Sequence, residues 1–161
     1  MLFRSEAARR GLHERVELVE GDPATFDDHG DLVMCIGAAQ VFGGADHAFR
    51  RFRELVLPGG RALVGTPFWE RPPGAAARTA HGDLPVYDGV VALARSAGFT
   101  VLHDDRATLE EWDAFEGAAR SVLEADDTPE ARAAAFARKR THEQEERGVL
   151  GFAWLVLRPS S

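Results

Sequence analysis

The stretch "RFRELVLPGGRALVGTPFW" (residues 51–69) contains the end of a helix with an apolar stripe, one sharp turn and an apolar strand, in that order. The helix is expected over residues 47–56, where Asp46 can cap its start. Leu57-Pro58-Gly59-Gly60 ends the helix, and residues 61–69 are typical of a buried strand. The stripe consists of Phe49, Phe52, Leu55 and Val56. Helix, turn and strand in this order form the repeating unit of α/β proteins.

Further strands and helices alternate on both sides of this unit. Residues 5–11 resemble the last turns of a helix that stops at Gly11. Strands are expected at 15–21, 31–37, 100–107 and 148–158. Helices are expected at 87–98, 109–124 and 129–146, and Thr128-Pro129 supplies a cap and first-turn pair for the last of them. The alternation predicts an α/β fold with a mostly parallel sheet.

The chain length and composition predict one domain over residues 1–161. Within it, 71–86 is expected to be a loop or insertion, and 109–147 a helical segment before the last strand. The net charge of −7 argues against a general nucleic-acid or anionic-membrane surface. The single cysteine, Cys35, and the lack of a signal-peptide core or a long apolar run favour a cytoplasmic location.

Three stretches in a fixed order resemble the class I S-adenosylmethionine-dependent methyltransferases. They are "VELVEGDPATF" (16–26), "FDDHGDLVMCIGAAQVFGG" (26–44) and "RFRELVLPGGRALVGTPFW" (51–69). "LARSAGFTVLHDD" (93–105) and "GFAWLVLR" (151–158) extend the resemblance over nearly the whole chain. It implies a Rossmann-like methyltransferase sheet, mostly parallel with an antiparallel C-terminal strand and incomplete at the N-terminus.

The resemblance implies that an acid after the first expected strand binds the cofactor's adenine. That role falls on Asp22, with the backbone of Pro23 and Ala24 beside it. A carboxylate at the carboxyl end of a strand lies where open α/β sheets bind ligands, and it can accept a hydrogen bond from an exocyclic amine. The alternative is that Asp22 only forms an Asx-type turn before Pro23.

The turn after residues 31–37 is expected to lie under the methionine part of S-adenosylmethionine. A glycine at position 37 allows close backbone approach and exposes a carbonyl group to the ammonium. The residues implied are Cys35, Ile36, Gly37 and Ala38. The alternative is that Gly37 only relieves a tight bend between strand and loop.

Candidates for the acceptor side lie in or after loops at the carboxyl ends of strands. They are Gln40, Phe42, His47, Trp69 and Tyr87. In-line methyl transfer chiefly requires alignment of the nucleophile and the sulfonium, in some enzymes with a general base. The resemblance implies a histidine near Gln40 and an acid near Thr66, and neither is present. The alternative for each aromatic residue is packing in the core.

Two features of the family have no counterpart in this sequence. No glycine-rich turn precedes residue 15, and no acid follows a second strand to bind the ribose. These gaps favour an N-terminally truncated methyltransferase. The absence of a basic surface and of a recognisable RNA- or protein-binding appendage favours a small molecule as its acceptor. The alternative is a non-catalytic, truncated or decayed methyltransferase-like protein that acts by association, with residues 31–37 as an apolar open edge of the sheet.

Other constellations fit less well. Cys35 as a hydrolase nucleophile needs a small residue two positions earlier, where Val33 stands. "THEQEERG" (141–148) begins like a zinc-protease helix, but Glu146 occupies the position of the second histidine, so no metal site is expected. The mixed charges of residues 137–148 predict a solvated helix face with intrahelical ion pairs.

Overall fold

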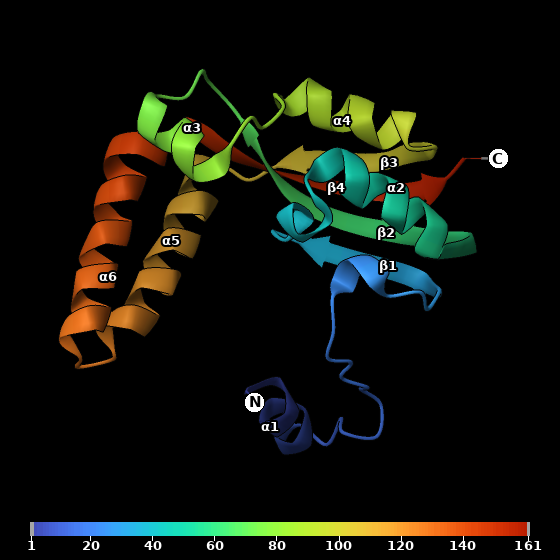
Figure 1. Cartoon of the computed structure of the whole chain (residues 1–161), viewed down its shortest axis with the longest axis horizontal. Helices are drawn as coiled ribbons and strands as arrows, with labels where there is room; N and C mark the ends of the chain where they lie inside the picture. The colour runs from blue at the N-terminus through green and yellow to red at the C-terminus, as the bar shows by residue number, and fades with distance from the viewer. Residues whose placement is uncertain (1, 161) are drawn as a thin grey trace.

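The structure, a computed structural model, describes residues 2–160 of the chain (Figure 1). Its helices are α1 (Leu2–Arg9), α2 (Ala45–Leu55), α3 (Ala75–His81), α4 (Tyr87–Ser96), α5 (Leu109–Glu124) and α6 (Pro129–Thr141). Its strands are β1 (Gly30–Ile36), β2 (Val56–Trp69), β3 (Phe99–Arg106) and β4 (Leu150–Pro159). Short 3-10 turns cover Pro23–Thr25 and Ala39–Phe42, and a π-helical turn covers His142–Glu146.

The four strands form one sheet in the order β1-β2-β4-β3. β1 pairs with β2 in parallel, and β4 is antiparallel to both of its neighbours. β1, β2 and β3 therefore run in one direction and only the C-terminal strand runs the other way. This confirms the predicted mixed α/β sheet.

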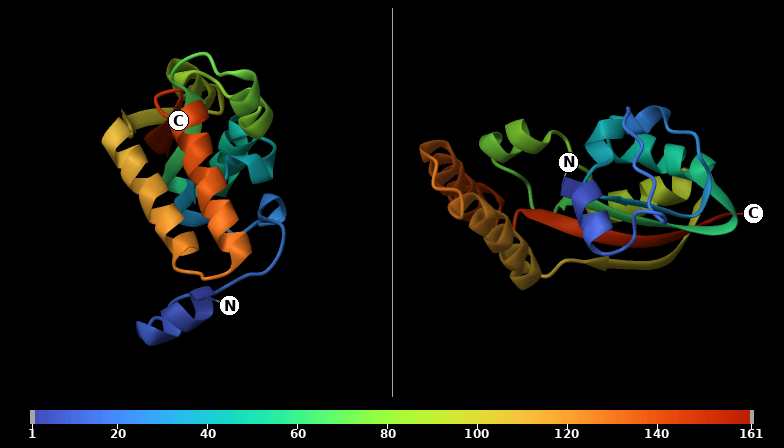
Figure 2. Two further views of the ribbon diagram at one scale, coloured as in Figure 1. Left: turned by 90° about the vertical axis from the view of Figure 1, so that its left-hand side faces the viewer. Right: turned by 90° about the horizontal axis from the view of Figure 1, so that it is seen from below.

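The core lies between this sheet and the helices α2 and α4, which cover one of its faces (Figures 1 and 2). Phe49 and Phe52 of α2 are 0% and 2% exposed, as the apolar stripe predicted. They pack in one cluster with Val64 of β2 and with Leu155 and Leu157 of the central strand β4. Burial of these large side chains is the main source of stability.

Most of the helix ends follow the sequence signals. Gly11 and Gly98 have φ values of +66° and +87°, so both residues adopt the left-handed conformation expected after a helix. The Thr128 hydroxyl accepts a hydrogen bond from the Ala131 N–H and caps α6 as predicted. The predicted cap at Asp46 is wrong: Gly44 is the N-cap of α2, and Asp46 forms an ion pair with Arg50 in the first turn instead.

The prediction that residues 15–21 form a strand is wrong. These residues lie outside the sheet. Val16 and Val19 expose 43% and 62% of their surface, and residues 16–20 join no ladder. A strand persists only where a neighbour pairs with its backbone groups, and β1 pairs only with β2 among the described residues. α1 accordingly lies apart from the sheet in Figure 1.

β1 is buried on one face only. Val33 and Cys35 pack against the core, but Leu32, Met34 and Ile36 on the other face are 55%, 56% and 46% exposed. The range 71–86 contains α3. Figure 2 shows α5 and α6 as an antiparallel pair that projects from one end of the sheet. No helix among residues 2–160 is long and apolar enough to cross a membrane.

Candidate functional site

A cleft of about 1110 Å³ opens at the carboxyl ends of β1 and β2. Ile36 and Gly37 form its floor at the end of β1, and Thr66 and Pro67 belong to β2. The other walls come from the end of α3, from α5 and α6, and from the start of β4. Open α/β sheets bind their ligands at this end of parallel strands.

The turn after β1 is shaped by glycine. Gly37 has φ +68°, and a Cβ built there would meet only a ring carbon of Phe152, at 4.0 Å. Its N–H donates to the Gly65 carbonyl at 2.9 Å, and its carbonyl accepts from the Gln40 side-chain amide at 3.2 Å. Gly37 thus leaves open space above a fixed backbone, which suits the close approach of a ligand.

Of the four predicted residues in this turn, Ile36 and Gly37 line the cleft, while Cys35 and Ala38 do not. Cys35 points toward the core, and burial raises the pKa of its thiol. A thiol with a raised pKa stays protonated and is a poor nucleophile. Ala38 is the N-cap of the 3-10 turn that carries Gln40.

Asp22 forms the Asx-type turn that the sequence left open as an alternative. Its Oδ1 accepts from the Ala24 N–H at 2.9 Å, and Pro23 occupies the first position of the turn. Its Oδ2 makes no hydrogen bond with residues 2–160, and the side chain is exposed outside the cleft lining. The turn therefore leaves one carboxylate oxygen free to accept a hydrogen bond.

The acceptor-side candidates separate into two groups. Gln40 lines the cleft, whereas Phe42, His47, Trp69 and Tyr87 do not. Tyr87 donates to the Asp104 carboxylate at 2.6 Å, and the Arg106 guanidinium lies 4.1 Å from its ring centroid. Burial, and then the bond to Asp104, raises the pKa of Tyr87 to about 12. Trp69 is only 5% exposed and packs against Leu150.

The cleft contains an imidazole–carboxylate pair that the sequence analysis missed. His81 Nε2 lies 2.6 Å from Glu146 Oε1, and both residues line the cleft. The Trp69 indole and the His81 ring lie nearly perpendicular, at 80°, with their centroids 5.9 Å apart. His81 and Glu146 are 65 positions apart. His81 lies in the range expected to be a loop, and Glu146 lies in the expected mixed-charge helix. No spacing signal could have joined them.

Aromatic side chains form another wall of the cleft. The Trp112 ring stacks on Phe115 at 5.5 Å and on Phe152 at 5.6 Å, with interplanar angles of 23° and 22°. Trp154 meets Phe152 edge to face at 5.1 Å. All four of these side chains line the cleft. A flat apolar or aromatic ligand would find stacking partners here.

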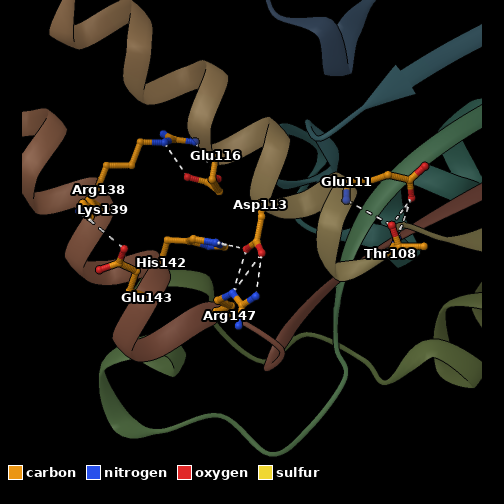
Figure 3. Close-up of polar contacts among 9 residues, drawn as sticks. All are labelled: Thr108, Glu111, Asp113, Glu116, Arg138, Lys139, His142, Glu143 and Arg147. Atoms are coloured by element: carbon orange, nitrogen blue, oxygen red, sulfur yellow. Dashed lines mark hydrogen bonds and ion pairs between the residues drawn. The ribbon is translucent and has the colours of Figure 1, made fainter.

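Ion pairs fix the helices that close the cleft (Figure 3). Arg138 of α6 binds Glu116 of α5 at 2.7 Å, and Asp113 accepts from His142 and Arg147, each at 2.8 Å. The intrahelical pairing predicted for residues 137–148 is present between Lys139 and Glu143, 3.9 Å apart, but Arg138, His142 and Arg147 pair with α5 instead. A capping box between Thr108 and Glu111 holds the start of α5.

The charge of the cleft lining is negative. Its charged groups are the carboxylates of Asp83, Glu111, Glu116 and Glu146 and the guanidinium of Arg138. Asp83 and Glu116 form ion pairs with Arg78 and Arg138, so Glu111 and Glu146 supply the negative excess, which favours a cationic ligand. The described residues hold no group of three or more His, Cys, Asp or Glu side chains that could bind a metal ion.

Comparison with known sequences gives one curated relative. The chain is 30% identical over 129 residues to the Uncharacterized protein YjhP of Escherichia coli (strain K12). The match covers 73% of this chain and 52% of YjhP, so the chain spans about half the length of that relative. No family model matches the chain.

Several solved structures with the same arrangement are described as SAM-dependent methyltransferases. A SAM-dependent methyltransferase from Geobacter sulfurreducens, in complex with S-adenosylhomocysteine, superposes with a TM-score of 0.79 at 24% identity, over 97% of this chain and 69% of that one. One from Thiobacillus denitrificans, with the same ligand, has a TM-score of 0.76 at 26% identity, over 97% and 69%. The crystal structure of YjhP has a TM-score of 0.78 at 24% identity, over 97% and 70%.

The chain therefore has the fold of the class I S-adenosylmethionine-dependent methyltransferases, which confirms the resemblance seen in the sequence. The cleft lies at the end of the sheet where this class of α/β fold binds its ligands.

Proposed function

We propose that this protein transfers a methyl group from S-adenosylmethionine to a small molecule. The observation that carries the proposal is the continuity of one cleft from the Gly37 turn to the His81–Glu146 pair. A cofactor at the turn and an acceptor at the pair would then share one cleft. When bound, S-adenosylmethionine would supply the methyl group as an electrophilic sulfonium.

The residues present fit the methionine end of this cofactor. Gly37 leaves room for close approach, and its carbonyl faces an amide donor that an ammonium group can replace. The negative lining favours the positively charged sulfonium. Asp22, with the free Oδ2 of its turn, is proposed to accept a hydrogen bond from the adenine amino group, beside Pro23 and Ala24.

A small acceptor follows from the size and lining of the cleft. Its volume of about 1110 Å³ suits a cofactor end and a small organic molecule. Its lining combines the aromatic wall with polar and charged side chains from several elements. This combination is typical of small-molecule sites.

Calorimetric titration with S-adenosylhomocysteine tests the cofactor assignment. Wild type is expected to bind in the micromolar range, and Gly37→Asn to lose binding because its side chain fills the approach space. Asparagine tolerates the left-handed conformation, so the turn is retained. Gly11→Asn is the matched control, since that glycine is also left-handed, with nothing within 4 Å. Equal affinity of Gly37→Asn and wild type would reject the assignment.

The exposed edge of β1 supports a second candidate function, association with a second copy of the chain. Antiparallel pairing of two β1 edges about Val33 would pair their open backbone groups and set Leu32 beside Met34 of the other copy on one face. Met34→Lys is expected to abolish a dimer in sedimentation analysis. Leu102→Lys, at a 44% exposed position on the opposite edge strand, is the control. A monomeric wild type at high concentration would exclude this association.

A further inference from the structure

The His81–Glu146 pair has the geometry of an oriented general base. Glu146 Oε1 lies 2.6 Å from Nε2, and the exposed fractions of the His81 and Glu146 side chains are 30% and 12%. A carboxylate that accepts the Nε2–H fixes the tautomer whose Nδ1 carries a lone pair. Nδ1 makes no hydrogen bond with the described residues, so it is free to accept a proton.

The position of His81 is fixed by the fold. His81 is the last residue of α3, and its ring packs nearly perpendicular to the Trp69 indole, with 5.9 Å between the ring centroids. Glu146 ends the π-helical turn, whose first residue, His142, is held by Asp113. Both partners are therefore anchored, as a proton-transfer pair requires.

The aromatic wall indicates what kind of nucleophile this base would meet. Trp112, Phe115 and Trp154 are partly exposed in the same cleft, and an aromatic ring binds such surfaces in offset or edge-to-face geometry. A hydroxyl group on the ring of such a ligand would lie near His81, the proposed base. A phenol combines the two requirements.

Resting on the proposed function, we propose that the acceptor is a phenol and that His81 removes its hydroxyl proton. Glu146 is a positioning residue, because it orients the imidazole and stabilises the imidazolium without touching the acceptor. Neither role follows from the methyltransferase fold itself.

The step balances without a further reactant. The phenol O–H proton passes to His81 Nδ1, and the imidazolium charge is paired with the Glu146 carboxylate. The oxygen lone pair forms the new O–CH₃ bond as the C–S bond of the sulfonium breaks, and that electron pair goes to sulfur. The proton then leaves His81 for water, so the products are a methyl ether and the thioether.

The first test needs no cofactor and uses 4-nitrophenol, whose ionised form is coloured. With a base at His81, bound 4-nitrophenol is expected to ionise at a lower pH in wild type than in His81→Gln. Glu146→Gln is expected to give an intermediate shift. The control is His103→Gln, on the exposed part of β3 outside the cleft lining. No binding by wild type, or the same ionisation in His81→Gln, would overturn the proposal.

The second test compares two acceptors in the presence of S-adenosylmethionine. 4-Methylphenol resembles the tyrosine side chain, with a pKa near 10, and needs a base, whereas 4-nitrophenol ionises far more readily. His81→Gln is expected to slow methylation of 4-methylphenol by about 100-fold or more and that of 4-nitrophenol much less. An equal loss for both acceptors would show a structural role and refute the base.

The outcomes separate this inference from the proposed function. If the chain binds S-adenosylhomocysteine but His81→Gln does not change the ionisation of bound 4-nitrophenol, the proposed phenol acceptor with His81 as its base is refuted. The cofactor assignment then remains intact. An ionisation shift that depends on His81, in a chain that does not bind S-adenosylhomocysteine, would support proton transfer and reject methyl transfer.

Discussion

The His142 imidazole lies 2.8 Å from the Asp113 carboxylate and joins the end of α6 to the start of α5. Arg147 binds the same carboxylate through two of its nitrogens. One acid thus holds both the helix pair and the chain that leads into β4 (Figure 3). Glu146 of the cleft is the neighbour of Arg147, so this contact also positions the proposed base pair.

Replacing Asp113 by Asn should lower the melting temperature at pH 7. The Arg147 hydrogen bonds, followed by that of His142, lower the pKa of Asp113 below its ordinary value of 3.8. A lowered pKa in the folded state gives stability that is present above pH 4 and lost as the pH falls through the folded value. Thermal unfolding at pH 7 and pH 3 should therefore show a larger gap between wild type and Asp113→Asn at pH 7. An equal gap at both pH values would refute the contribution.

The single tyrosine of the chain should titrate at about pH 12. Because Tyr87 is the only such residue, its ionisation can be followed by ultraviolet absorbance without assignment. Asp104→Asn should lower the pKa, since it removes the accepting carboxylate and its charge. A pKa raised by folding gives stability that is present below pH 10 and lost as the pH rises through 12. A value near 10 in the folded protein would contradict the contact.

Phe49→Ala should destabilise the protein by about 3–5 kcal/mol, because it leaves a cavity under the sheet. Phe49 is 0% exposed, whereas Phe136 on α6 is 69% exposed. Phe136→Ala is therefore the control and should change the free energy of unfolding by less than about 1 kcal/mol. Urea unfolding measures both, and similar losses would contradict the assigned core.

Gly65→Ala should destabilise the protein and distort the aromatic wall. A Cβ at Gly65 would lie 2.6 and 2.9 Å from ring atoms of Phe152, a buried residue that cannot move freely. The cost is expected to be about 1–3 kcal/mol. Gly117→Ala within α5 meets nothing within 4 Å and should instead stabilise by about 0.5–1 kcal/mol. Urea unfolding measures the free energy of unfolding of both variants. An unchanged value for Gly65→Ala would refute the close packing of Gly65 against Phe152.

The sequence predicted most of the fold because its signals are local. Gly11, Gly98 and Thr128 end or begin helices through their own backbone and side-chain chemistry. The stripe on α2 marks the buried face through its spacing alone. Residues 15–21 show the limit, since a strand also needs a neighbour, and alternating apolar residues do not specify one.

The sequence predicted residues of the candidate site only at the end of one strand, β1. Ile36, Gly37 and Gln40 reach the cleft because they lie at the end of β1 or just after it. Tyr87 and Trp69 turn away from it, and their partners Asp104 and Leu150 come from other strands. His81 and Glu146 meet only after the helices α5 and α6 have folded back, which no local pattern encodes.

Hydrogen–deuterium exchange with and without S-adenosylhomocysteine tests the central claim, that the cleft at the end of β1 binds the cofactor. Backbone amides in turns exchange through local opening, and a ligand slows that opening where it binds. Residues 37–44 and the turn at 22–26 should become protected, while exchange in β3 stays unchanged. Unchanged exchange at residues 37–44 under saturating ligand would contradict the account.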